Sequence, residues 1–110
     1  MAVERISTVV PVDDLAGAVA RWSAVLGADP TFVDGDRWAQ FDVGPSRIAL
    51  AGTDRSTDRT GVMMKVDDAA AARAAYEAAG VAVGPMVEGP HEYRFEVEGL
   101  DAPITVYSGR

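Results

Sequence analysis

An internal repeat constrains this chain more than any other feature of its sequence. The segment STVVPVDDLAGAVARWSAVLG at 7–27 is followed by the similar segment GVMMKVDDAAAARAAYEAAG at 61–80. An offset of 54 residues places VDD on VDD, Trp22 on Tyr76, and the F-x-V triplet at 41–43 on that at 95–97. These matches keep one register through a strand, a helix and a further strand, which alanine-rich composition alone does not explain. The repeat predicts two copies of one structural unit.

The first copy has the pattern of one helix among four strands. Apolar residues spaced as on one helix face predict a helix over Leu15–Leu26, capped by Asp13 or Asp14 and ended by Gly27. Alternating or β-branched runs predict strands at 5–12, 31–33, 37–43 and 47–51. The expected order of this copy is therefore β-α-β-β-β.

The second copy repeats this order. A strand at 61–66 leads to a helix over Ala69–Ala79, capped by Asp67 or Asp68 and closed by Gly80. Further strands are expected at 81–87, interrupted by Gly84 and Pro85, and at 91–97 and 103–108. We therefore expect an α+β fold in one domain over 1–110, with module one at 1–52, a polar linker at 53–59 and module two at 60–110.

Composition narrows the classes of partner. The 110 residues suit one compact domain, and the absence of cysteine excludes disulfides, thiolate chemistry and zinc knuckles. A net charge of -7, spread along the chain, would repel a nucleic-acid backbone. Neither a signal peptide nor an apolar run of about 18 residues is visible. We expect a cytoplasmic protein that binds neither nucleic acid nor membrane.

Two tandem βαβββ modules, the first opening with VPVDDLAGAVARWSAVLG, resemble the vicinal oxygen chelate superfamily, which includes glyoxalases, bleomycin-resistance proteins and ring-cleaving dioxygenases. The resemblance covers essentially the whole chain, and the second module is a looser copy. It implies that the two modules form a cupped, mixed β-sheet with the helices on its outer face. It also implies a homodimer and one ligand space enclosed by two half-cups.

The same resemblance indicates where metal ligands would stand. Metal enzymes of the superfamily place a histidine in the first strand and a glutamate in the last strand of each module. Carried onto this sequence, the histidine positions are Ser7 and Gly61, and the glutamate positions are Ala49 and Thr105. None of these side chains is a normal ligand of a divalent metal. We therefore expect neither the usual metal site nor any other cofactor.

Strand alternation predicts which side chains face the cup. It sends Trp38, Gln40 and Asp42 to one face and Ala39, Phe41 and Val43 toward the helix. In the first strands Ser7, Val9, Gly61, Met63 and Lys65 should face the cup, and in the last strands Arg47, Ala49 and Ala51 should correspond to Pro103, Thr105 and Tyr107. The candidate ligand-binding residues are Ser7, Trp38, Gln40, Arg47, Met63, Arg94, Thr105 and Tyr107.

Each of the more informative candidates also has a purely structural interpretation. Trp38 could cover a dimer interface, and Met63 could fill the core. Arg94 could pair with Glu92 two residues away, whereas an unpaired arginine would favour an anionic or carbonyl-bearing ligand. Trp22 and Tyr76 are assigned to the core alone.

Three functions compete at this point. The first is a metal-free protein that sequesters a planar, partly aromatic small molecule such as an antibiotic or natural product, as bleomycin-resistance proteins do. The second is an enzyme, either a lyase or isomerase that uses His91, Glu92 or Tyr107 as acid and base, or a metal enzyme with displaced ligands. The third is a structural or regulatory dimer without a ligand. The vacant metal-ligand positions favour the first function.

Overall fold

The computed structural model describes residues 2–53 and 59–110, so positions 54–58 of the expected linker lie outside it. Contacts divide the chain into two compact units. The first unit is Ser7–Thr60, and the second joins the residues up to Ile6 to Gly61–Arg110. The boundary falls inside strand β1 (Val3–Pro11), so this one strand contributes residues to both units.

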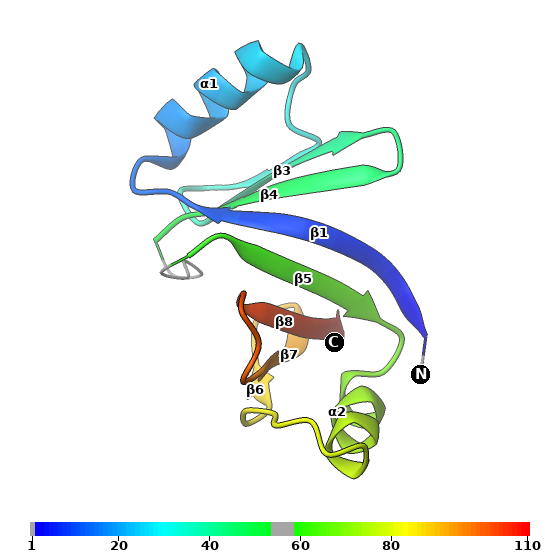
Figure 1. Ribbon diagram of the computed structural model, residues 1–110. Helices are drawn as coiled ribbons and strands as arrows, with labels where there is room; N and C mark the ends of the chain where they lie inside the picture. Colours follow the sequence, from blue (N-terminus) through cyan, green and yellow to red (C-terminus); the bar gives the residue numbers. More distant parts are fainter. Residues whose placement is uncertain (1, 54–58) are drawn as a thin grey trace. The chain divides into compact units, whose positions relative to one another are not determined.

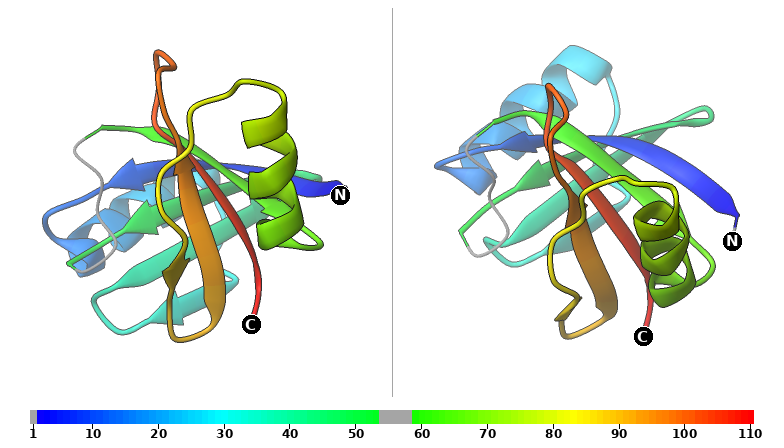
Figure 2. Two further views of the ribbon diagram at one scale, coloured as in Figure 1. Left: turned by 90° about the horizontal axis from the view of Figure 1, so that it is seen from below. Right: turned by 60° about the horizontal axis from the view of Figure 1, so that its bottom comes forward.

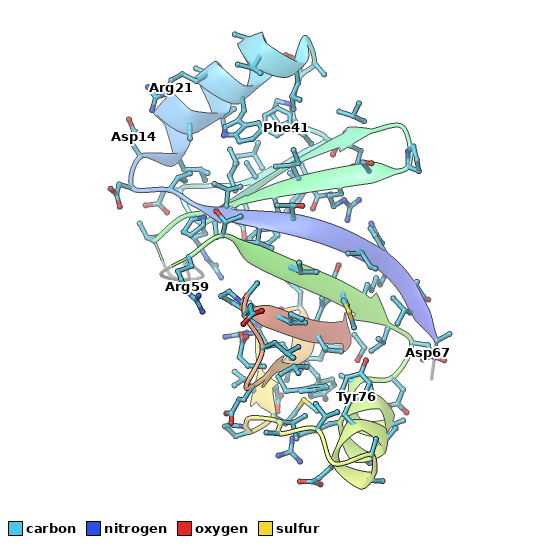
Figure 3. All side chains as sticks on the ribbon, in the orientation of Figure 1. Asp14, Arg21, Phe41, Arg59, Asp67 and Tyr76 are labelled. Atoms are coloured by element: carbon cyan, nitrogen blue, oxygen red, sulfur yellow. The ribbon has the colours of Figure 1, made fainter. Side chains whose placement is uncertain are left out.

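In the first unit, helix α1 (Leu15–Leu26) packs on strands in the order β2-β3-β4-β1 (Figure 1). The strands β2 (Phe32–Asp34), β3 (Trp38–Val43) and β4 (Ser46–Ala51) are antiparallel neighbours, and β1 runs parallel to β4. Leu15 and Ala18 of α1 pack on Ala39, Phe41 and Leu50. Val43 was expected on this packed face, but it ends β3 and is 50% exposed. Figure 3 shows Phe41 beneath the helix.

The second unit repeats the arrangement with strands in the order β5-β8-β7-β6 (Figure 2). Its elements are β5 (Gly61–Val66), α2 (Ala69–Ala78), β6 (Val87–Glu88), β7 (Glu92–Val97) and β8 (Ile104–Gly109). Strand β5 runs parallel to β8, and the other pairs are antiparallel. Phe95 and Val106 lie in its core, where Tyr76 of α2 meets Phe95 edge to face at 5.9 Å between ring centroids. The predicted α+β class and the βαβββ order of each copy are confirmed.

Aspartates cap both helices, as the sequence predicted, and the structure decides between the alternatives. The Asp14 carboxylate accepts from Gly17 N–H at 3.1 Å, and the Asp68 carboxylate accepts from Ala71 N–H at 3.0 Å. Gly27 ends α1 in the left-handed region with φ of 65°. Helix α2 ends at Ala78, one residue before its expected end, and Gly80 follows with φ of 85°. Local chemistry that is visible in the sequence therefore begins both helices and ends α1.

The strand expected at 81–87 is wrong for most of its length. Only an isolated bridge between Val83 and Val97 precedes the two-residue strand β6. Gly84 N–H donates to Glu96 O at 2.9 Å, and the next residue, Pro85, has no N–H with which to continue a ladder. Among the described residues, no helix is long and apolar enough to cross a membrane.

Candidate functional site

Each unit has one sheet face that points away from its helix, which we call the distal face. In the first unit the strand register places Ser7 beside Arg47, Gln40 beside Ala49, and Trp38 beside Ala51. The neighbouring residues Ala39, Phe41 and Leu50 point to α1. The distal face therefore holds four of the predicted binding residues, Ser7, Trp38, Gln40 and Arg47, as strand alternation predicted.

The polar side chains of the first distal face bind one another. Arg47 donates to both carboxylate oxygens of Asp42, from Nε at 2.7 Å and from Nη2 at 3.2 Å. Thr31 Oγ1 donates to the same carboxylate at 2.6 Å. Trp38 Nε1 donates to Gln40 Oε1 at 3.4 Å. The two-point pairing commits the guanidinium of Arg47 to the protein itself.

The second distal face gathers the other four candidates and one further residue. Met63 lies beside Thr105, and Tyr107 lies between Lys65 on β5 and Arg94 on β7. Because Met64 and Val66 belong to the core beneath α2, alternation turns Lys65 to the distal face. Lys65 was absent from the predicted binding set, although alternation placed it on this face and it is the only lysine of the chain.

Glu92 is a buried carboxylate, 5% exposed, at the edge of this face. Its Oε1 accepts from Arg94 Nη1 at 2.8 Å, and its Oε2 accepts from the main-chain N–H of His91 at 3.2 Å. The Glu92 and Arg94 side chains therefore pair, as the structural interpretation of Arg94 proposed. Thr105 Oγ1 donates to Glu96 Oε1 at 2.8 Å. Both oxygens of the Glu92 carboxylate therefore accept hydrogen bonds from the protein itself.

The register corrects one predicted correspondence between the modules. Asp42 lies opposite Arg47, and Glu96 opposite Thr105, so the last strands correspond with an offset of 58 although the third strands keep 54. Arg47 thus corresponds to Thr105 and not to Pro103. The cause is loop length, because two residues connect β3 to β4 whereas residues 98–103 connect β7 to β8. Ala49 then corresponds to Tyr107.

The distal faces do not fit the metal site of the superfamily's enzymes. Ser7 and Gly61 occupy the histidine positions, and in either register the last strands offer only Arg47, Ala49, Thr105 or Tyr107 where a glutamate would stand. Within the described ranges no three histidine or carboxylate side chains are grouped closely enough to hold a metal ion. The residues at these ligand positions therefore offer neither the imidazole nor the carboxylate that divalent metals require.

A shallow hollow of about 360 Å³ lies along α1. Its lining is Val12, Ala18, Arg21, Trp22 and Val25. Trp22 therefore does more than the sequence indicated, since it packs against the core and also lines this hollow. The hollow is a second surface with an aromatic ring near an arginine, so binding experiments need to distinguish it from the distal faces.

Comparison by sequence finds no matching family model and no matching curated protein. Comparison by structure finds matches along nearly the whole chain. An NAD-dependent benzaldehyde dehydrogenase from Legionella pneumophila matches with a TM-score of 0.84 at 11% identity, over 96% of this chain and 99% of that one. Methylmalonyl-CoA epimerase from Mycobacterium tuberculosis matches with 0.71 at 16% identity, over 98% and 89%.

A glyoxalase/bleomycin resistance protein/dioxygenase superfamily member from Vibrio splendidus matches with a TM-score of 0.67 at 13% identity, over 94% of this chain and 97% of that one. The chain therefore has the fold of the glyoxalase and bleomycin-resistance proteins, as the resemblance of its sequence implied. At such low identities the likeness concerns the fold alone. Enzymes of different names share this fold, so the chemistry of this chain must be argued from its own residues.

Proposed function

We propose that this chain binds a small, planar, partly aromatic molecule such as an antibiotic or natural product and sequesters it without a metal or cofactor. One observation carries the proposal. The carboxylates of the distal faces, Asp42, Glu92 and Glu96, each accept a hydrogen bond from a neighbouring side chain of the same face. Groups arranged in this way can orient a ligand, but they do not form the convergent acid, base or metal-ligand set of an enzyme.

The apolar members of these faces support a flat ligand. Trp38 in the first unit and Tyr107 in the second are half-buried aromatic rings with hydrogen-bonding groups close by, whereas Met63 is only 9% exposed. A ligand held by such surfaces would be withdrawn from solution in proportion to the amount of protein. A stoichiometric binder therefore lowers the free concentration of a toxic compound without any reaction.

Thermal unfolding tests the proposal most directly, with the purified protein against divalent metals and a panel of planar antibiotics and natural products. A compound that binds only the folded state raises the melting temperature by mass action. We expect stabilisation by at least one planar compound and none by metals. Near-stoichiometric stabilisation by one transition metal, or turnover of the bound compound, would make the protein an enzyme and end this proposal.

Fluorescence locates the binding surface, because Trp22 and Trp38 are the only tryptophans. In Trp22→Phe all tryptophan emission comes from Trp38, and in the matched Trp38→Phe variant it comes from Trp22. We expect a planar compound that binds at the first distal face to quench the first variant and not the second. For such a compound, Trp38→Ala should weaken binding by about 1–3 kcal/mol while the protein still unfolds cooperatively.

We also propose that the protein works as a homodimer, with the planar ligand enclosed where two copies meet. Support comes from large apolar side chains exposed on the described strands, including Ile6 at 61%, Phe32 at 51% and Val43 at 50%. Light scattering on a size-exclusion column measures the assembly directly. A mass of one chain at every concentration tested would remove this part of the proposal.

A further inference from the structure

We infer that three side chains of the second distal face, Lys65, Tyr107 and Arg94, bind the carboxylate edge of a planar aromatic acid. This inference rests on the proposed function and names the class of ligand. The three residues form what we call the cationic row, in which a tyrosine lies between two cations on adjacent strands. Tyrosine offers a ring face to stack on, and the two cations offer N–H donors on either side of it.

The spacing of the row suits one carboxylate. Neighbouring strands lie about 4.8 Å apart, so the Cα atoms of Lys65 and Arg94 are separated by roughly 10 Å across the tyrosine. Both cations have long side chains that can lean toward the middle. Arg94 remains 31% exposed at its side chain, and Lys65 and Tyr107 are half-buried. The row therefore remains within reach of a ligand.

The nearby acidic groups do not consume the donors of the row. Arg94 donates to Glu92 from Nη1 to Oε1, whereas Arg47 in the first unit uses two nitrogens on Asp42. Because a guanidinium has five N–H donors, Arg94 held by Glu92 still has donors to offer. Glu96 accepts from Thr105, and among the described residues Lys65 has no ion-pair partner. Glu92 thus acts as a positioning residue for Arg94.

The first unit supplies an internal comparison. In the corrected register, Tyr107 corresponds to Ala49, which lies between Val9 and Gln40. The equivalent row in the first unit is therefore Val9, Ala49 and Gln40, which carries no charge and no aromatic ring. The repeat alone does not require a lysine, a tyrosine and an arginine at these positions. The difference between the two rows points to a ligand group that only the second unit recognises.

The overall charge of -7 sharpens this conclusion. A chain with this charge repels anions at long range, so an anionic ligand needs a local concentration of positive charge. Of the ten basic residues, Lys65 and Arg94 lie on one sheet face with a single neighbour between them. Aromatic acids, rather than neutral or cationic aromatic compounds, are the class that this arrangement selects.

Matched acids and amides test the inference on the full chain. The probes are 2-naphthoate with 2-naphthamide, and the acid and amide forms of anthracene and of quinoline, measured by calorimetry at low salt. We expect each acid that binds to bind about tenfold more tightly than its amide, because charge-assisted hydrogen bonds add to the stacking. Raising the salt to about 0.5 M should weaken the acids and leave the amides unchanged.

Four variants assign the preference to its residues. Lys65→Gln and Arg94→Gln should each reduce the preference for the acid toward equality, and Lys65→Arg should retain it. Lys65→Gln is the safer variant, since this residue is half-buried and without an ion-pair partner in the described part of the chain. Arg21→Gln, in the hollow on α1, serves as the matched arginine control and should change nothing.

The outcomes separate this inference from the proposed function. Equal binding of acids and amides, or loss of the preference in Arg21→Gln but not in Lys65→Gln, overturns the cationic row as the site. If neutral planar compounds from the broader panel bind and no aromatic acid does, the cationic row is also overturned as the site, but the proposed function stands. Failure of every planar compound to bind overturns both.

Discussion

At the scale of single residues, Gly89 controls whether the Glu92 and Arg94 side chains can pair. A Cβ at this position would lie 2.7 Å from Glu92 Cδ and 2.8 Å from Arg94 Nη1, closer than real Cβ contacts come. Gly89 N–H also donates to Glu92 O at 2.8 Å, which fixes the turn. The small size of this residue therefore sets the position of Arg94.

We predict that Gly89→Ala displaces the Glu92 and Arg94 pair. The variant should lose about 1–3 kcal/mol of unfolding free energy, as overpacking typically costs, and should weaken the preference for aromatic acids. Urea unfolding and calorimetry measure the two effects. Gly109→Ala is the matched control, because a Cβ there meets nothing within 4 Å. Equal stability of the two variants would show that the pair tolerates the added methyl group.

Strand alternation was sufficient to predict the faces of the candidate residues, but not their contacts. The sequence placed Trp38, Gln40 and Arg94 on distal faces because Phe41 and Phe95 mark the buried side of β3 and β7. Whether Arg94 pairs with Glu92 remained open, since two residues on one strand face can turn toward or away from each other by rotamer choice. The pairing of two such side chains therefore follows from the three-dimensional structure and not from the strand pattern.

At the scale of elements, the N-cap aspartates make a clean test of local helix chemistry. Asp14→Ala and Asp68→Ala each remove a carboxylate that accepts a main-chain N–H of the first turn. Each should lower the unfolding free energy by about 1 kcal/mol. Asp13→Ala is the matched control, because Asp13 is exposed and the cap hydrogen bond of α1 is made by Asp14, so the loss of Asp13 should cost little. Equal losses in Asp13→Ala and Asp14→Ala would contradict the assignment of the cap.

Asp67 ties the start of β1 to the turn before α2 (Figure 3). The main-chain N–H of Ala2 donates to Asp67 Oδ1 at 2.9 Å and holds the pKa of that carboxyl below its usual range. A group whose pKa is lowered by folding stabilises the protein above its unfolded pKa, and that contribution is lost as the pH falls through the folded pKa. Stability gained from this contact should therefore be present at neutral pH and disappear in acid.

We predict a small pH-dependent difference between the wild type and Asp67→Asn. Because Asp67 is exposed, the wild type should be only slightly more stable at neutral pH, and the difference should disappear as the pH falls through the lowered pKa of folded Asp67. Urea midpoints at a series of pH values measure it, with Asp13→Asn as the exposed aspartate for comparison. A difference that grows as the pH falls would have the wrong sign for this contact.

Element boundaries followed from the sequence wherever a local signal set them. The helix predicted over Leu15–Leu26 has those bounds because a cap and a left-handed glycine delimit it, and β5 was likewise predicted at its observed bounds. The strand predicted over 81–87 was wrong because Gly84 and Pro85 interrupt it, so that only a single bridge forms at Val83. The predicted correspondence between the last strands of the two modules was wrong because the length of the preceding loop, and not the residue pattern, sets it.

At the scale of the whole molecule, the repeat gives the chain two similar distal faces but only one cationic row. Any site built from features common to both copies would bind two ligands per chain. A site that requires Lys65, Tyr107 and Arg94 binds one, because Val9, Ala49 and Gln40 stand at the equivalent positions. Duplication preserved the fold, whereas the proposed recognition belongs to one copy.

We therefore predict a stoichiometry of one aromatic acid per chain, measured by calorimetry and by native mass spectrometry with 2-naphthoate or another acid that binds. Two acids bound per wild-type chain would instead show that the repeat itself, and not the cationic row, recognises the ligand.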